Sequence, residues 1–164
     1  MKWRGESPAQ RVLGHNLPKN LKERFLPAVS DISERYETLA HMWALDYHLA
    51  FFEQSVSGHP WILVPYERLI VHGKSELHRI MGAIGEVVNS EMEQRMGVAS
   101  TSASNDLNTE NRKNQLKKWK SHLSTKQIER ILEIAHLYDI DWYTADGEPT
   151  YSKINSLQQN KARW

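Results

Sequence analysis

The chain has 164 residues, enough for the core of one domain, and its 40% apolar and 25% charged residues are ordinary values for a globular protein. Its net charge of +1 at pH 7 argues against a basic coat for nucleic acid or membrane. The absence of cysteine excludes disulfides, cysteine-ligated zinc and a cysteine nucleophile, and no apolar run approaches the roughly 20 residues of a membrane helix. We therefore expect a cytoplasmic protein without a membrane partner.

The first third of the chain is expected to hold one long helix after an irregular start. Residues 1–29 are predicted to be irregular because they contain four helix breakers. These are Pro8, Gly14, Pro18 and Pro27. Asp31 and Glu34 then have the spacing of a capping box, and apolar side chains follow at helical intervals. These signals predict a helix over about residues 31–56, closed by Gly58.

One buried strand is predicted next. Residues 61–66 read Trp-Ile-Leu-Val-Pro-Tyr, an apolar run that is typical of a strand inside a parallel sheet. Pro65 cannot donate to a ladder, so the strand should end there or lie at an edge. A lone strand cannot satisfy its own backbone groups. Either short strands elsewhere in the chain pair with it, or the rest of its sheet lies outside this chain.

Several shorter helices are predicted after the strand. A turn at Gly73 should precede a helix over about residues 77–84, for which Gly85 is a suitable C-terminal cap. A capping box of Ser90 and Glu93 predicts a further helix near residues 91–96. Polar residues 98–111 are typical of a long loop, and residues 112–121 of a basic helical stretch.

The clearest start signal lies near the C-terminal end of the chain. Ser124 and Gln127 form a capping box for a last long helix. Its predicted buried face consists of Ile128, Ile131, Leu132 and Ala135. Residues beyond Thr144 are polar and are expected to be a loosely held tail.

Two segments carry side chains suited to binding a nucleotide. Tyr66-Glu67-Arg68-Leu69 follows the predicted strand, where an aromatic ring can stack on a flat ligand. Its alternative is a tyrosine packed under a loop and a glutamate in a surface ion pair. Residues 112–120 hold five cations in nine positions, and Arg and Lys there can grip phosphate. The alternatives are a solvated helix face or contact with nucleic-acid phosphate.

Two weaker features also contain residue types that occur in binding sites. Thr101 and Ser102 have hydroxyls that can bond a ligand, but loop residues of this kind are commonly turn formers. The eight histidines form no metal-ligand signature. His41 and His48 are spaced to share a helix face, yet without paired ligands they are expected to be core-edge or surface imidazoles.

The order of these motifs resembles the C-terminal half of the sulfotransferases that use 3′-phosphoadenosine-5′-phosphosulfate (PAPS). That family has a strand ending in Tyr-Glu-Asp-Leu, a helix ending in a Leu-Gly-like pair, a Thr-Ser loop, Arg-Lys-Gly, and Gly-Asp-Trp-Lys before a long helix. Here Tyr66-Glu67-Arg68-Leu69, the helix up to Gly85, Thr101-Ser102, Arg112-Lys113 and Trp119-Lys120 follow in the same order, over roughly residues 61–137. The motifs are short, and their order carries most of the specificity.

The resemblance implies roles for five residues. Tyr66 would contact the adenine, with Thr101 and Ser102 nearby, and Arg112 and Lys113 would hold the 3′-phosphate. No catalytic residue and no metal ligand is implied. The sulfuryl group would pass from PAPS to a hydroxyl-bearing small molecule or carbohydrate. Nucleic acid is an unlikely partner on this interpretation, and a second copy of the chain remains an open one.

The implied fold class is α/β and helix-rich, a partial three-layer P-loop-like sulfotransferase fold with a small parallel sheet. Residues 1–143 would be the C-terminal part of that domain and residues 144–164 a polar tail. The family's N-terminal cradle for the phosphosulfate has no counterpart before Asp31, so we expect the chain to be inactive alone. Asn114 in place of the family's glycine and Arg68 in place of its acidic residue indicate a divergent, bacterial-type or carbohydrate-type member.

Two other functions are compatible with the sequence. The basic segment Arg112–Lys120 would suit a module that binds nucleic acid, with Trp119 stacking on a base. Alternatively, the chain is a helical subunit that binds a protein partner through an exposed apolar strand.

Overall fold

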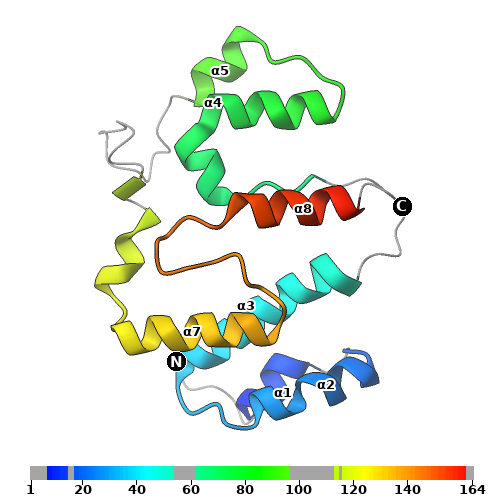
Figure 1. The fold of residues 1–164 in the computed structure, drawn as a ribbon, viewed down its shortest axis with the longest axis vertical. Helices are drawn as coiled ribbons and strands as arrows, with labels where there is room; N and C mark the ends of the chain where they lie inside the picture. Colours follow the sequence, from blue (N-terminus) through cyan, green and yellow to red (C-terminus); the bar gives the residue numbers. More distant parts are fainter. Residues whose placement is uncertain (1–6, 15–16, 54–61, 97–112, 115, 162–164) are drawn as a thin grey trace. The chain divides into compact units, whose positions relative to one another are not determined.

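A computed structural model describes residues 7–14, 17–53, 62–96, 113–114 and 116–161. The chain divides into two compact units, drawn together in Figure 1. The first consists of Met1–Gly58 and Ser124–Asp141, and the second of His59–Leu123 and Trp142–Trp164. Each unit is built from two stretches of chain.

Most of the described residues are helical, and the predicted α/β class with a small parallel sheet is wrong. Ile62–Pro65 leads into a helix as non-helical chain, and no strand or ladder occurs within the described ranges. The physical reason is that a strand is stable only when neighbouring strands pair with its backbone N–H and carbonyl groups. No second β-rich segment in the described part of the chain supplies such a neighbour.

The first unit begins with two helices where we predicted irregular chain. They are α1 (Pro8–Leu13) and α2 (Lys19–Val29). Pro8 is the first residue of α1, where the missing N–H of proline costs nothing, and the Ser7 side chain caps that helix. Pro27 lies inside α2 near its C-terminal end. The prediction of irregular chain from prolines is therefore wrong here, because the effect of a proline depends on its position in the helix.

The long central helix is α3 (Arg35–His48), followed by the π-helical segment η1 (Leu49–Glu53). It starts later than predicted, because Glu34 and Glu37 form its capping box and Asp31 with Glu34 does not. The last helix of this unit, α7 (Thr125–Leu137), confirms the box of Ser124 and Gln127.

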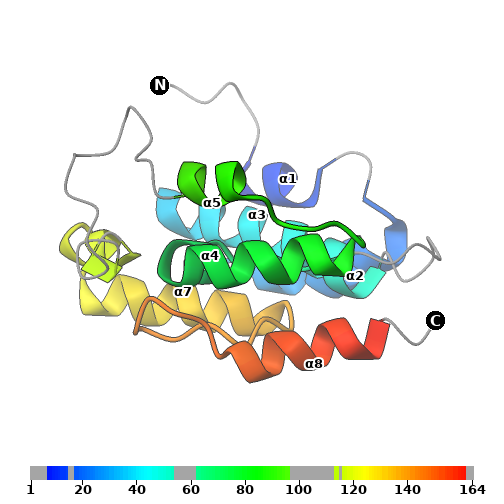
Figure 2. The same ribbon diagram turned by 90° about the horizontal axis from the view of Figure 1, so that it is seen from above.

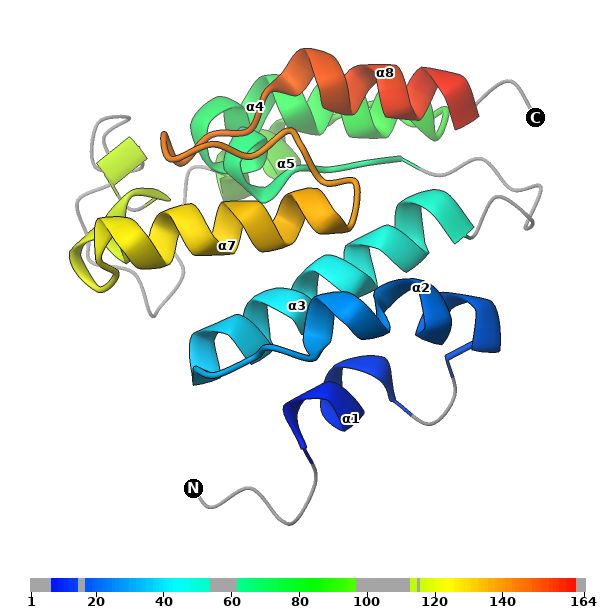
Figure 3. The same ribbon diagram turned by 60° about the horizontal axis from the view of Figure 1, so that its bottom comes forward.

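The core of the first unit forms around α3. Figure 3 shows α7 on one side of α3 and α1 and α2 on the other, and α3 contacts both α1 and α7. Ile134 and Ala135 are the buried residues of α7, so Ala135 of the predicted face is confirmed, while Ile128, Ile131 and Leu132 are half-buried. Phe25 stacks on Tyr138 with ring centroids 4.5 Å apart. These contacts fix α2 and the end of α7 to the same core.

Polar side chains also lie inside this core. His41 and His48 share the inner face of α3 and are fully buried, not at the core edge or the surface. The Nδ1 atom of His41 lies 3.0 Å from the Tyr138 hydroxyl, and Nδ1 of His48 lies 3.0 Å from the Tyr138 carbonyl oxygen. Tyr138 therefore ties the end of α7 to both histidines.

Glu37 is the charged member of this buried set. Burial alone would raise its pKa, but hydrogen bonds from Arg130, from the N–H groups of Ser33 and Glu34, and from the Ser33 hydroxyl hold the pKa at about 2. The carboxylate is therefore ionised at neutral pH and links α3 to α7 through Arg130 at 2.9 Å.

The second unit contains α4 (Tyr66–Ala83), α5 (Ser90–Met96), the 3-10 helix η2 (Lys118–Ser121) and α8 (Tyr151–Lys161). Figure 2 shows α5 beside α4, with which it is in contact. The structure confirms the helix near residues 91–96. A short 3-10 helix replaces part of the predicted basic helix, and α8 occupies the segment that we expected to be a loose tail.

The turn predicted at Gly73 lies next to a break in α4, where two helical segments meet at a kink. α4 begins at Tyr66, and His72 has non-helical backbone angles (φ −115°, ψ 21°). The Ser75 hydroxyl donates to the His72 carbonyl at 2.9 Å, which partly compensates for the interrupted backbone bonds. Gly85, with φ 80°, follows the end of α4 as the C-terminal cap that we predicted.

Acid should destabilise the first unit through His41. Burial, together with the charge of Arg130, lowers the pKa of His41 from 6.5 to about 4, so the unfolded chain binds this proton more readily than the folded chain. The contribution to the free energy of unfolding is complete above pH 6.5 and is lost as the pH falls toward 4, with a loss of about 2 kcal/mol between pH 7 and pH 5.

Urea unfolding at both pH values checks this expectation. The variant His41→Gln, which does not titrate in this range, should lose about 2 kcal/mol less than the unaltered chain between pH 7 and pH 5. Equal losses in the two proteins would show that His41 is not the group responsible.

Candidate functional site

The structure describes two of the five residues predicted to bind nucleotide. Tyr66 is the first residue of α4 and is 64% exposed, and Lys113 is also exposed. Thr101, Ser102 and Arg112 lie outside the described residues. No hydrogen bond or ion pair within the described ranges joins Tyr66 to Lys113. The meeting of an aromatic ring with the Arg-Lys pair therefore stays a prediction.

The start of α4 presents Tyr66 to solvent. Pro65 precedes the helix with extended angles (φ −61°, ψ 127°), and its carbonyl accepts from the Leu69 N–H at 3.1 Å. Proline is buried here while the next residue is exposed, so the chain turns outward at the start of the helix. Tyr66 thus occupies the first turn of a helix and not the end of a strand.

A buried carboxylate shared by two arginines lies close to this helix start. Glu76 is 1% exposed, and we call it together with Arg68 and Arg79 the Glu76 clamp. The Nε atom of Arg79 donates to Oε2 of Glu76 at 2.8 Å, and Nε of Arg68 lies 3.0 Å from the same oxygen. Hydrogen bonding to Glu76 raises the pKa of Arg79. The carboxylate is therefore fully compensated despite its burial.

The clamp also reaches the segment that precedes Tyr66. Nη2 of Arg79 donates to the carbonyl oxygen of Leu63 at 2.8 Å. In the absence of a ladder within the described residues, this bond satisfies one backbone group of Ile62–Pro65. Sequence reasoning assigned Glu76 and Arg79 no role, and their spacing of three residues in a helix was the only signal available.

Arg68 connects the clamp to α8. Its Nη1 atom donates to Asn155 at 3.3 Å, and its guanidinium lies 5.6 Å from the centroid of the Tyr151 ring. Burial first, and then the nearby carboxylates of Glu148 and Glu67, raise the pKa of Tyr151. Arg68 therefore has a structural role in the second unit.

The basic segment is only partly exposed. Leu116 is buried, Lys117 and Lys118 are exposed, and Trp119 is half-buried with the Lys120 ammonium 5.7 Å from its ring centroid. A Cβ atom at Gly147 would lie 3.2 Å from the Leu116 carbonyl oxygen. The loop around Gly147 thus packs backbone against backbone on the segment that begins with the predicted phosphate ligands.

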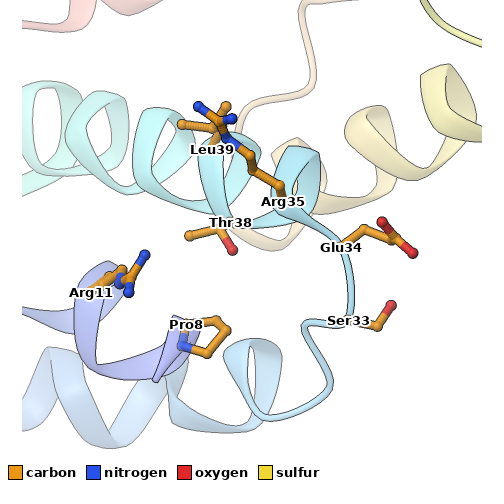
Figure 4. Close-up of a pocket in the computed structure, with 7 residues that line it drawn as sticks. All are labelled: Pro8, Arg11, Ser33, Glu34, Arg35, Thr38 and Leu39. Atoms are coloured by element: carbon orange, nitrogen blue, oxygen red, sulfur yellow. The ribbon is translucent and has the colours of Figure 1, made fainter. Parts of the chain in front are cut away.

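A small cavity in the first unit includes none of the predicted residues. It has a volume of about 240 Å³ and is lined by the start of α3 and by Pro8 and Arg11 of α1. Figure 4 shows Arg11 and Arg35 extending from these two helices, with Thr38 between them. Glu34 also lines the cavity, so its charge is mixed and favours no particular ligand.

Searches for metal-ligand groups, membrane-spanning helices and similar proteins give no further indication of a site. Within the described residues, no group of three or more His, Asp or Glu side chains is arranged to hold a metal ion. No helix in the same ranges is both long and apolar enough to cross a membrane. Comparisons of the chain with models of known families, with curated proteins and with solved structures gave no match.

Gly147→Ala should destabilise the second unit by about 1–2 kcal/mol. Gly147 has φ 84°, a left-handed conformation that costs an L-residue energy, and the added Cβ would crowd the Leu116 carbonyl. The matched control is Gly82→Ala in α4, where a Cβ meets nothing within 4 Å and helix propensity should improve by about 0.5–1 kcal/mol. Urea unfolding of the two variants measures both effects, and equal stability of the two would contradict the packing described here.

Proposed function

We propose that this chain supplies the adenine and 3′-phosphate contacts of a PAPS-dependent sulfotransferase-type protein. The observation that carries the proposal is the order of five short motifs, from Tyr66-Glu67-Arg68-Leu69 to Trp119-Lys120. The exposed ring of Tyr66 and the exposed ammonium of Lys113, both in the second unit, support it. Tyr66 lies at the start of a helix and not at the end of a strand, so the first motif supports the proposal by residue type and order alone.

The proposed contacts match the chemistry of the ligand. A phenol ring can stack on the flat adenine, and such stacking contributes about 1–3 kcal/mol per base. Arg112 and Lys113 would meet the 3′-phosphate with charge-assisted hydrogen bonds, which are stronger than neutral ones. Thr101 and Ser102 would add hydroxyl groups near the adenine. These residue types together fit an adenine nucleotide with a phosphate on its ribose.

These contacts serve recognition and not the chemical step. Sulfuryl transfer is an in-line displacement like phosphoryl transfer, in which the acceptor hydroxyl loses its proton and negative charge develops on the leaving nucleotide. The 3′-phosphate is remote from that centre, so gripping it supplies binding energy that orients the reacting end. None of the five residues handles the sulfuryl group. We therefore expect no turnover when this chain alone is assayed with labelled PAPS and hydroxyl acceptors.

Arg112→Ala should weaken binding of adenosine 3′,5′-bisphosphate to the chain. The loss of one or two charge-assisted bonds corresponds to about 2–4 kcal/mol, or a dissociation constant raised about 30-fold or more. Titration followed by two-dimensional NMR of the ¹⁵N-labelled chain measures weak binding and reports whether Lys113 and Tyr66 respond.

The matched control is Arg95→Ala. Arg95 is an exposed arginine of the same unit that pairs with Glu91 on its own helix, so its loss should leave the affinity unchanged. Equal affinity of the Arg112→Ala variant and the unaltered chain would remove Arg112 from the proposed site. Salt-dependent binding of RNA or DNA without any binding of the bisphosphate would favour the nucleic-acid alternative.

A further inference from the structure

The kink at His72 allows two distant parts of α4 to meet. A straight helix rises about 1.5 Å per residue, so Arg79 would lie about 20 Å along the axis from Tyr66. In the structure Arg79 instead bonds the carbonyl of Leu63, which precedes the helix, at 2.8 Å. Figure 1 shows the two segments of α4 meeting at an angle. The second segment of α4 therefore lies close to the chain that precedes the helix.

The Glu76 clamp holds this folded-back geometry. Arg68 lies before the kink, and Glu76 and Arg79 lie after it. The shared carboxylate is buried, whereas the side chains of both arginines are 27% exposed. Removing either arginine would leave a buried carboxylate with one partner, which is costly. A change in the angle between the two helix segments would therefore separate Arg68 from the buried Glu76 carboxylate, at a cost in free energy.

Tyr66 has little else to fix its position. Its side chain is 64% exposed, so packing around the ring does not determine where the ring lies. The backbone on both sides of Tyr66 is instead held by the clamp, through Arg79 at Leu63 and through Arg68 at Glu76. A substitution in the clamp would therefore move the ring although Tyr66 itself is not substituted.

We infer that Arg79 is a positioning residue that sets where Tyr66 presents its ring to an adenine base. The inference rests on the proposed function and adds a residue that the resemblance does not assign. Arg79 acts through the carbonyl of Leu63 and the carboxylate of Glu76, and it does not touch the ligand. Lysine cannot replace it, because a single ammonium cannot reproduce the planar fork that serves both acceptors.

The test is a double-mutant cycle that combines Arg79→Lys with Tyr66→Ala, measured as the affinity for adenosine 3′,5′-bisphosphate. In the chain that keeps Tyr66, Arg79→Lys should raise the dissociation constant about fivefold to tenfold. In the Tyr66→Ala background, the same substitution should raise it by less than about twofold. Arg95→Lys is the matched control, since it makes the same change at an exposed pair on α5 and should leave the affinity unchanged.

The cycle distinguishes a positioning role of Arg79 from a general structural role. A general structural role would weaken binding equally in both backgrounds, and that result would overturn the inference. Intact binding by the Arg79→Lys variant would overturn it as well. No binding by the unaltered chain would instead overturn the proposed function. If Arg79→Lys fails to fold by circular dichroism, the isosteric Glu76→Gln is measured in its place, and it should show the same dependence on Tyr66.

Discussion

A carboxylate removed from water must keep its partners, and in this protein that requirement shapes the second unit. Glu76 is buried between Arg68 and Arg79, and the two arginines come from opposite sides of the kink in α4. Because the charge is costly to leave uncompensated, the kink, the start of the helix and the preceding extended chain are linked. The first unit uses the same principle, with Glu37 held by Arg130 between α3 and α7. In both units a buried ion pair joins separate helical segments.

Local signals predicted helices well where they were complete. The box of Ser124 and Gln127 and the cap at Gly85 are both present, because each needs only a few neighbouring residues. Prediction failed where the outcome depends on distant partners. The apolar run ending at Pro65 was predicted to be a strand. Instead, its Leu63 carbonyl accepts a hydrogen bond from Arg79, beyond the kink in α4, and no ladder occurs in the described residues. The prolines at positions 8 and 27 were interpreted as breakers, yet both lie in helices, where their position decides their effect.

The candidate site could be predicted only in part. The roles of Tyr66 and Lys113 are predictions from residue type and order, and the structure shows only that both residues are exposed. Sequence reasoning assigned Arg79 no role, because a turn predicted at Gly73 does not show that the following helix brings Arg79 to the Leu63 carbonyl. It also assigned His41 and His48 to the core edge or surface, although hydrogen bonds to Tyr138 allow both to be buried. In each case the burial or the role of the side chain depends on a hydrogen-bond partner that is distant in sequence and that a local pattern does not specify.

The central claim is that Tyr66 contacts an adenine base while the Arg-Lys pair holds the phosphate of the same nucleotide. Photolabelling with 8-azidoadenosine 3′,5′-bisphosphate, followed by mass spectrometry of the digested chain, tests it most directly. We expect label on the peptide that contains Tyr66, and this labelling should saturate with concentration and be displaced by unmodified adenosine 3′,5′-bisphosphate. Label confined to peptides of the first unit, or label that the unmodified nucleotide does not displace, would contradict it.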